Sequence, residues 1–268
     1  MPNPNLPVEI LDYIADYLHD TNDALRNCCL ISKSWISRTR KHLFANIKFH
    51  VVEDVRSWKK MFPDPSTSPA RYAKALYFDP DVVLVADREV GGWIRGFSRV
   101  EHLEVVGLGA FFPRRPPHLA PFHGFSPVIK SLRVAVPILP LSQIFNLILS
   151  FPLLEDLDVM QTRAHGVWVD NGDIPGEDEM LTAAQLLRPP LFTGSLELYL
   201  MGGMEHFTRR LLSLPGSIHF RKLIWTWLYE ENLPSMKALV EGCSHTLESL
   251  DIACDLRGMA ILHLRLHR

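Results

Sequence analysis

The segment VEHLEV, residues 100–105, carries the pattern that decides the fold. Val100 is followed three positions later by Leu103, and two positions after that by Val105. Successive side chains of an extended chain point to opposite faces, so the leucine and the residue two positions later share one face. A short stretch of this kind predicts a β-strand with one buried face.

The same pattern recurs along most of the chain. It occurs at residues 73–78, 100–105, 129–134, 154–159, 220–225 and 247–252, with a looser copy at 196–200. Its anchoring leucines are Leu76, Leu103, Leu132, Leu157, Leu196, Leu223 and Leu250. Five of the six spacings between them are 25 to 29 residues, and the spacing from Leu157 to Leu196 is 39. Self-similarity at a fixed period of this length predicts a repeat architecture.

Helical stretches are expected before most of these strands. The candidates are residues 54–62, 87–94, 142–149, 205–212 and 235–240. Regular alternation of helix and strand predicts parallel strands stacked in a solenoid, because one unit alone cannot bury its own leucines. The fold class is therefore α/β.

Residues 5–48 have a different organisation and predict a helical unit. Ile10, Ile14 and Leu18 recur at every fourth position and form one apolar stripe of a first helix. Pro7 suits the start of that helix, where a missing N–H is not needed. A second helix is expected over residues 23–30.

A third helix is expected after Ser32, with Trp35, Ile36 and Leu43 as apolar anchors. The first helix carries only acidic charges and the third mainly basic ones, and we interpret both as solvated faces with weak mutual attraction. A unit this short buries little surface, so it should rest on the next domain or on a partner. We therefore expect a helical domain over residues 1–50 and a repeat domain over residues 51–268.

The N-terminal motif carries a family resemblance. Leu6-Pro7-x-Glu9-Ile10, followed by Ile14, Leu18, Leu25, Ser32-Lys33-Ser34-Trp35 and Leu43-Phe44, resembles an F-box. The remainder resembles the irregular leucine-rich-repeat domains that often follow one, in the divergent form frequent among fungal F-box proteins. The positions where regular repeats carry asparagine or cysteine hold other residues here, so the solenoid should be irregular.

The resemblance implies a function. F-box proteins bind a Skp-family adaptor, which ties them to a cullin scaffold in an SCF-type ubiquitin ligase, and their second domain binds the target. The residues that would form or support the adaptor surface are Leu6, Pro7, Ile10, Leu11, Leu25 and Trp35. For Leu25 and Trp35, packing between the helices is an equally open interpretation. Burying an exposed apolar side chain such as Leu6 is worth about 1.5–3 kcal/mol.

The predicted strands also define a candidate surface for the target. Residues that alternate with the buried leucines face the opposite side of the sheet. The candidates are His102, Glu104, Arg133, Asp156, Asp158, Glu197, Tyr199, Lys222 and Asp251. This strip leans acidic, and the alternative is that each of these residues is only solvated surface.

Two loops interrupt the repeat, near residues 109–127 and 161–190. The first is aromatic, basic and proline-rich, and the second is acidic, with no Lys or Arg between Ala164 and Leu187. The acidic loop is either a disordered insert or a docking site for a basic segment. After the last strand the apolar residues Ile261, Leu262, Leu264 and Leu266 suggest either a truncated repeat or a segment that packs back on the core.

Several function classes are not supported by the sequence. A net charge of −2 gives no electrostatic case for nucleic acid or an anionic membrane, and there is no secretory signal or membrane span. Cys28, Cys29, Cys243 and Cys254 show no zinc or disulfide spacing and predict reduced thiols in the cytoplasm or nucleus. No phosphate-binding, hydrolase or metalloprotease motif is present, so we expect a non-enzyme without cofactor or metal. The competing hypotheses are a repeat scaffold outside any ligase and an enzyme with an unrecognised site.

Overall fold

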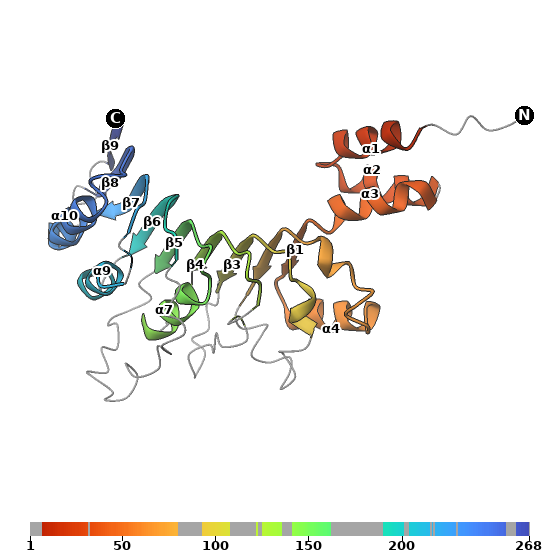
Figure 1. Cartoon of the computed structure of the whole chain (residues 1–268), viewed down its shortest axis with the longest axis horizontal. Coiled ribbons are helices and arrows are strands. Elements are labelled where there is room, and N and C mark those ends of the chain that lie inside the picture. The colour runs from red at the N-terminus through yellow and green to blue at the C-terminus, as the bar shows by residue number, and fades with distance from the viewer. Residues whose placement is uncertain are drawn as a thin grey trace, which may run out of the picture.

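The structure is a computed structural model in which three helices are followed by one curved sheet (Figure 1). It describes residues 7–31, 33–79, 93–107, 122, 125–135, 141–161, 190–200, 204–214, 216, 218–228, 230–255 and 261–267. The predicted α/β class, a three-helix unit before a leucine-rich-repeat-like array of parallel strands, is confirmed.

The sheet of the described residues contains nine strands in sequence order. They are β1 Asn46–Phe49, β2 Ala75–Phe78, β3 His102–Val106, β4 Ser131–Ala135, β5 Asp156–Gln161, β6 Ser195–Leu200, β7 Lys222–Leu228, β8 Ser249–Asp255 and β9 Ile261–His267. Strands β1 to β8 pair in parallel, and β9 pairs antiparallel with β8.

The seven anchoring leucines form one continuous row across the sheet. Leu76 is opposite Leu103, and the pairing continues strand by strand to Leu250. The register holds between Leu157 and Leu196 in spite of the longer spacing there. Six of the seven leucines are buried, and Leu250 is partly buried, which explains why leucine recurs at these positions.

Strand β1 was not predicted, and it lies within the segment that we assigned to the helical domain. Ile47 pairs with Leu76 and Phe49 with Phe78, so the sheet begins inside the expected helical domain. The repeat pattern misses this strand because it carries isoleucine in place of the anchoring leucine. The helical unit therefore ends at Leu43, and the segment from Asn46 belongs to the sheet.

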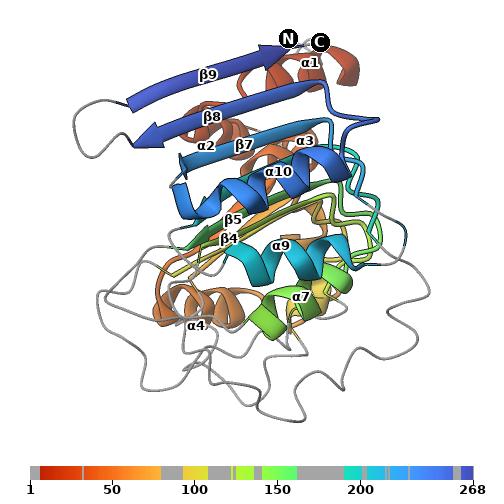
Figure 2. The same ribbon diagram turned by 90° about the vertical axis from the view of Figure 1, so that its left-hand side faces the viewer.

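One face of the sheet is covered by helices. Figures 1 and 2 show α4, α7, α9 and α10 on the same side of the strands, and the sheet is concave on the opposite side. The four helices are α4 Val52–Met61, α7 Leu141–Leu149, α9 Met204–Leu212 and α10 Leu233–Gly242, and short 3-10 turns lie at η1 Pro69–Tyr72, η2 Ile94–Gly96 and η5 Glu230–Asn232. They confirm four of the five predicted helices; the fifth, residues 87–94, lies mostly outside the described residues.

The core lies between these helices and the sheet. Its N-terminal end is aromatic: Phe49 stacks on Phe78 with ring centres 5.1 Å apart, and Trp58 and Phe97 pack around them. Towards the C-terminus the core becomes mainly aliphatic. This packing is continuous from β1 to β8, so the repeats are stabilised by their neighbours.

The helical unit consists of α1 Val8–Tyr17, α2 Asn22–Ile31 and α3 Lys33–Leu43. Helix α3 packs against both α1 and α2. Immediately after α3, the ring of Phe44 lies 6.1 Å from those of Trp58 and Phe62 in the repeat domain. The unit is therefore anchored to the repeats by an aromatic contact, as expected for a unit too small to stand alone. None of the helices in the described residues is long and apolar enough to cross a membrane.

Candidate interaction surfaces

The first candidate surface is an apolar stripe on α1. Leu11 and Ala15 form its buried face. Ile10, Tyr13 and Tyr17 point elsewhere and are 46%, 73% and 80% exposed. Of the stripe predicted from the sequence, Ile10 is exposed, while Ile14 and Leu18 are partly buried, so the stripe lies between the buried and the outward faces of α1.

The end of α2 adds further exposed apolar residues, Leu30 and Ile31. Among the described residues, six of the eleven large exposed apolar side chains lie in α1 and α2, although these helices are a small part of the chain. Single apolar residues on a surface are ordinary, but a concentration of them marks an interaction site. We call this set, Val8, Ile10, Tyr13, Tyr17, Leu30 and Ile31, the apolar surface.

The predicted adaptor residues divide into two groups. Pro7 and Ile10 are exposed and Trp35 is half-buried, whereas Leu6 lies outside the described residues. Leu11 and Leu25 are 8% and 0% exposed, which leaves them the supporting part of the predicted role. They pack the helices together and can only support the surface from within.

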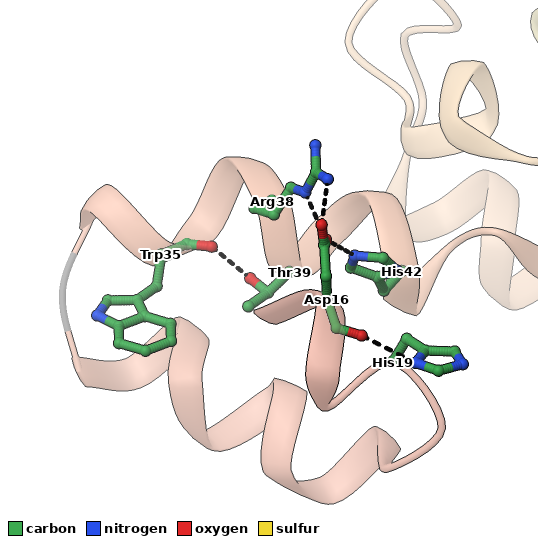
Figure 3. Close-up of polar contacts among 6 residues, drawn as sticks. All are labelled: Asp16, His19, Trp35, Arg38, Thr39 and His42. Carbon is green, nitrogen blue, oxygen red and sulfur yellow. Dashed lines mark hydrogen bonds and ion pairs between the residues drawn. The ribbon is translucent and has the colours of Figure 1, made fainter. Parts of the chain in front are cut away.

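An ion-pair cluster joins α1 to α3 (Figure 3). The Asp16 carboxylate accepts hydrogen bonds from Nε and Nη2 of Arg38 at 2.6 and 2.5 Å, and it lies 2.7 Å from Nε2 of His42. Nδ1 of His19 lies 2.8 Å from the Asp16 backbone oxygen. The interpretation of these charges as merely solvated faces is therefore wrong for Asp16, which is held from two sides.

The cluster changes the titration of its members. Hydrogen bonds from Arg38, and then from His42, hold the pKa of the Asp16 carboxyl well below its usual range. The same hydrogen bond raises the pKa of Arg38. A two-pronged guanidinium–carboxylate contact fixes orientation as well as distance. It therefore helps to set how α1, and with it the α1 part of the apolar surface, is held on α3.

The second candidate surface is the concave face of the sheet. The strand register aligns Glu104, Arg133, Asp158, Glu197, Ile224 and Asp251 in one row across β3 to β8. A neighbouring row contains His102, Ser131, Asp156, Ser195, Lys222 and Ser249. The predicted strip thus lies together as expected, with Tyr199 in a third row beside Met160 and Thr226.

A shallow cavity of about 500 Å³ opens on this face. It extends from Ala75 on β2 to Glu197 on β6, and its walls carry all five predicted residues of β3 to β5. Lys222, Asp251 and Tyr199 lie outside it. The sheet centre is therefore the hollowed part of the predicted strip.

Asp158 is the most perturbed group in the cavity. Burial is the main cause that raises its pKa to about 6, opposed by Arg133 and reinforced by Glu197 and Glu104. Arg133 Nε lies 3.0 Å from Asp158 Oδ2, an ion pair that lacks the alignment of a hydrogen bond. The other carboxylate oxygen, Oδ1, is buried without a hydrogen-bond partner among the described residues.

The cations of the face are unevenly distributed. Arg133 lies between Glu104 and Asp158 in the row, and Lys222 pairs with Asp251 at 3.4 Å. Glu197 has no ion pair within the described part of the chain, and its neighbour on β7 is the apolar Ile224. In the described residues, Arg133 is therefore the one cation paired with the adjacent carboxylates of Asp158 and Glu197, and it contacts Asp158.

Asp156 has a structural role that the sequence did not reveal. Its Oδ1 accepts hydrogen bonds from Ser195 N at 2.6 Å and Ser195 Oγ at 2.7 Å. At the other steps from β1 to β8, a backbone carbonyl before one strand accepts the two amides that begin the next. Here the carbonyl of Glu155 takes only the Gly194 amide. Asp156 completes the irregular step between β5 and β6, which reduces its capacity for a target.

A ladder of charges runs along the start of the strands. The charge of the residue two positions before each anchoring leucine alternates in sign from one repeat to the next. This alternation is visible in the sequence, although our sequence predictions did not include it. Lys74 pairs with Glu101, Lys130 Nζ lies 3.6 Å from Glu101, and the pattern resumes with Arg221 and Glu248 at 3.8 Å. Its members are Lys74, Glu101, Lys130, Glu155, Arg221 and Glu248, with Gly194 at the irregular step. Hydrogen bonding from Lys74 lowers the pKa of Glu101.

Where the structure describes them, the cysteine, histidine and acidic side chains do not gather into a metal-binding group. Burial raises the pKa of the Cys243 thiol to about 11, which favours its protonated form near neutral pH. Cys28, Cys29 and Cys243 are free thiols. Within the described residues no group of three or more His, Cys, Asp or Glu side chains could hold a metal ion.

Comparisons with protein-family models, with curated proteins and with solved structures found no match to this chain.

Proposed function

We propose that this chain is a non-catalytic, target-recruiting subunit of an SCF-type ubiquitin ligase. In this proposal the apolar surface of α1 and α2, together with Leu6 and Pro7, binds a Skp-family adaptor, and the concave face of the sheet binds the target protein. The subunit contributes no reacting group. It raises the rate of ubiquitin transfer by holding target lysines near a conjugating enzyme.

The exposed stripe of α1 carries the proposal. A helix that packs on only one side normally presents polar residues to water. In α1 the outward side carries Ile10, Tyr13 and Tyr17. Each such side chain gains about 1.5–3 kcal/mol when a partner buries it, which is enough for a small set to support tight binding. The stripe follows directly on the Leu6-Pro7 motif that resembles the start of an F-box.

The way the unit is mounted supports the same proposal. A recruiting subunit must hold its target at a fixed position relative to its adaptor. Phe44, the residue directly after α3, packs on Trp58 and Phe62. The first strand starts only two residues later, at Asn46. Figure 1 shows the three helices at the N-terminal end of the concave face. No flexible linker separates the two candidate surfaces.

The test is the affinity of the full chain for a purified Skp-family adaptor, measured by calorimetry. We expect submicromolar binding by the natural sequence and a loss of more than about tenfold, or 1.4 kcal/mol, for Leu6→Asp/Ile10→Asp. A charge placed on a contact surface must be desolvated, which is unfavourable.

Val51→Asp/Met61→Asp is the matched control. Both residues are exposed apolar side chains at α4, outside the helical unit, and the variant adds the same charge. It should bind the adaptor as well as the natural sequence does. No binding by the well-folded natural chain would refute the ligase proposal and leave the alternative, a leucine-rich-repeat interaction scaffold whose helices cap the sheet.

A further inference from the structure

The concave face has a deficit of positive charge at its centre. The row of Glu104, Arg133, Asp158 and Glu197 contains three acids and one base. Neighbouring strands lie about 4.8 Å apart, so adjacent carboxylates of a row face one another at close range. The Asp158–Glu197 step is the one where two acids are directly adjacent.

Among the described residues, Asp158 has one basic partner, Arg133, and Glu197 has none. Arg133 lies on the far side of Asp158, and Lys222 is engaged by Asp251 two strands beyond Glu197. Asp158 is 22% exposed and Glu197 is partly exposed, so water only partly screens their repulsion. Repulsion from Glu197 contributes to the raised pKa of Asp158. A cation between the two carboxylates would relieve the conflict.

The shape of the site fits an extended chain. The cavity crosses β2 to β6, and four strand spacings cover about 19 Å, the length of roughly six extended residues. Met160 and Tyr199 flank the charged row on one side, and Ile224 follows Glu197 along it. These residues offer apolar contact beside the acids.

We propose that the concave face binds an extended, lysine- or arginine-containing segment of a partner protein, with one of its cations seated between Asp158 and Glu197. This proposal rests on the assignment of the target to the sheet face in the proposed function and adds the chemical class of the target. A metal ion is the less suitable occupant, because no three metal-ligating side chains converge in the described residues and Ca²⁺ takes 6–8 oxygen ligands.

The test is fluorescence anisotropy of the full chain with a labelled peptide of about eight residues that alternates lysine with serine and glycine. Its counterpart with every lysine acetylated has the same length without the charges. We expect the lysine peptide to bind, the acetylated peptide to bind at least about tenfold more weakly, and the affinity to fall as salt is added. EDTA should leave the affinity unchanged.

The decisive variant is Asp158→Asn/Glu197→Gln, which keeps the shapes of both side chains. We expect it to weaken binding of the lysine peptide by at least about tenfold. The matched control is Glu53→Gln/Glu241→Gln, which removes two charges from α4 and α10 on the helical side of the sheet. That control should bind within about twofold of the natural chain.

Two results would overturn the proposal. Equal loss in the Asp158/Glu197 variant and in the Glu53/Glu241 control would show non-specific attraction to an acidic protein. Absence of binding by the natural chain, whose fold is checked by circular dichroism, would show that lysine peptides are not its ligands. Adaptor binding through α1 and α2 is measured without peptide, so neither result affects it. The peptide assay and the adaptor assay therefore test this inference and the ligase proposal separately.

Discussion

Asp158 lies between opposite influences on its two neighbouring strands. Arg133 on β4 favours its ionised form, while Glu197 on β6, Glu104 on β3 and burial oppose it. Asp156 on the same strand points to the same face but is engaged by Ser195. A carboxyl with a pKa of about 6 in the folded chain and about 3.9 when unfolded binds protons more readily in the folded state. Ionised Asp158 therefore destabilises the free protein.

The sign of this effect gives a prediction for Asp158→Asn. The penalty of ionisation is fully present above about pH 6 and absent below about pH 4. The free energy of unfolding of the variant should therefore be about 1–2 kcal/mol higher than that of the natural chain at about pH 7.5. The increase is limited because Arg133 loses its partner. At about pH 4 the two should be equal. Urea denaturation at both pH values measures the difference, and an equal destabilisation at both would contradict the charge conflict.

Among the secondary-structure elements, α1 is held on α3 by its buried residues Leu11 and Ala15 and by one polar residue, Asp16. The Asp16 contact with Arg38 and His42 is partly exposed, since the Asp16 side chain is 41% accessible, so solvent screens it. Its value lies in orientation: the same contact that joins the helices holds the apolar surface in place. Local loss of this contact should loosen α1 without unfolding the sheet.

We expect Asp16→Asn to cost about 1 kcal/mol of local stability in α1 near neutral pH. Because the folded pKa of Asp16 is depressed, its contribution is complete above about pH 4 and is lost as pH falls further towards the folded pKa. Hydrogen exchange of the α1 amides measures it. Asp23→Asn, which removes the exposed pair with Arg26, is the control and should change exchange by less than about twofold. Equal effects of the two variants would refute the role of Asp16.

The irregular step between β5 and β6 depends on a glycine. A Cβ atom at Gly194 would lie 2.3 Å from Oδ1 of Asp156, the oxygen that accepts from Ser195. The close approach of this carboxylate to the backbone therefore requires glycine at position 194. Glycine and carboxylate act as one unit that replaces the carbonyl used at the other steps.

A double-mutant cycle tests this unit. Gly194→Ala displaces the carboxylate, and Asp156→Ala removes it, so each variant should lose about 1–3 kcal/mol through an unsatisfied Ser195 amide. The double variant should lose clearly less than the sum, because the same hydrogen bonds cannot be lost twice. Denaturant unfolding of all four chains provides the free energies. Additive losses would mean that the two residues act separately.

For the whole molecule, the sequence predicts the repeats far better than the surfaces. Seven strands and four helices follow from leucine spacing and periodicity, because burial of one face imposes a pattern that is visible in one dimension. Strand β1 was missed because Ile47 and Phe49 occupy the inward positions of the pattern and Ile47 replaces the anchoring leucine. The sheet face was placed correctly because strand alternation fixes which side chains share a face.

The contacts between distant segments were not predictable in this way. The acids of α1 and the bases of α3 were visible, but only the fold shows that Asp16, and not a neighbouring acid, meets Arg38. Likewise, strand alternation assigned Asp156 to the exposed face of the sheet. Its hydrogen bond from Ser195 could not be predicted, because it depends on the register between segments 39 residues apart. For Leu25 the motif left surface support and helix packing open, and the fold shows that it is completely buried.

The preserved register of Leu157 and Leu196 has a consequence for protein engineering. The longest turn of the solenoid leaves the row of leucines unchanged, so the length of a turn and the alignment of the sheet vary independently. The segment between β5 and β6 is therefore the place to graft a foreign epitope or a reporter domain. The local clamp of Gly194, Asp156 and Ser195 would keep the strands aligned behind such an insertion.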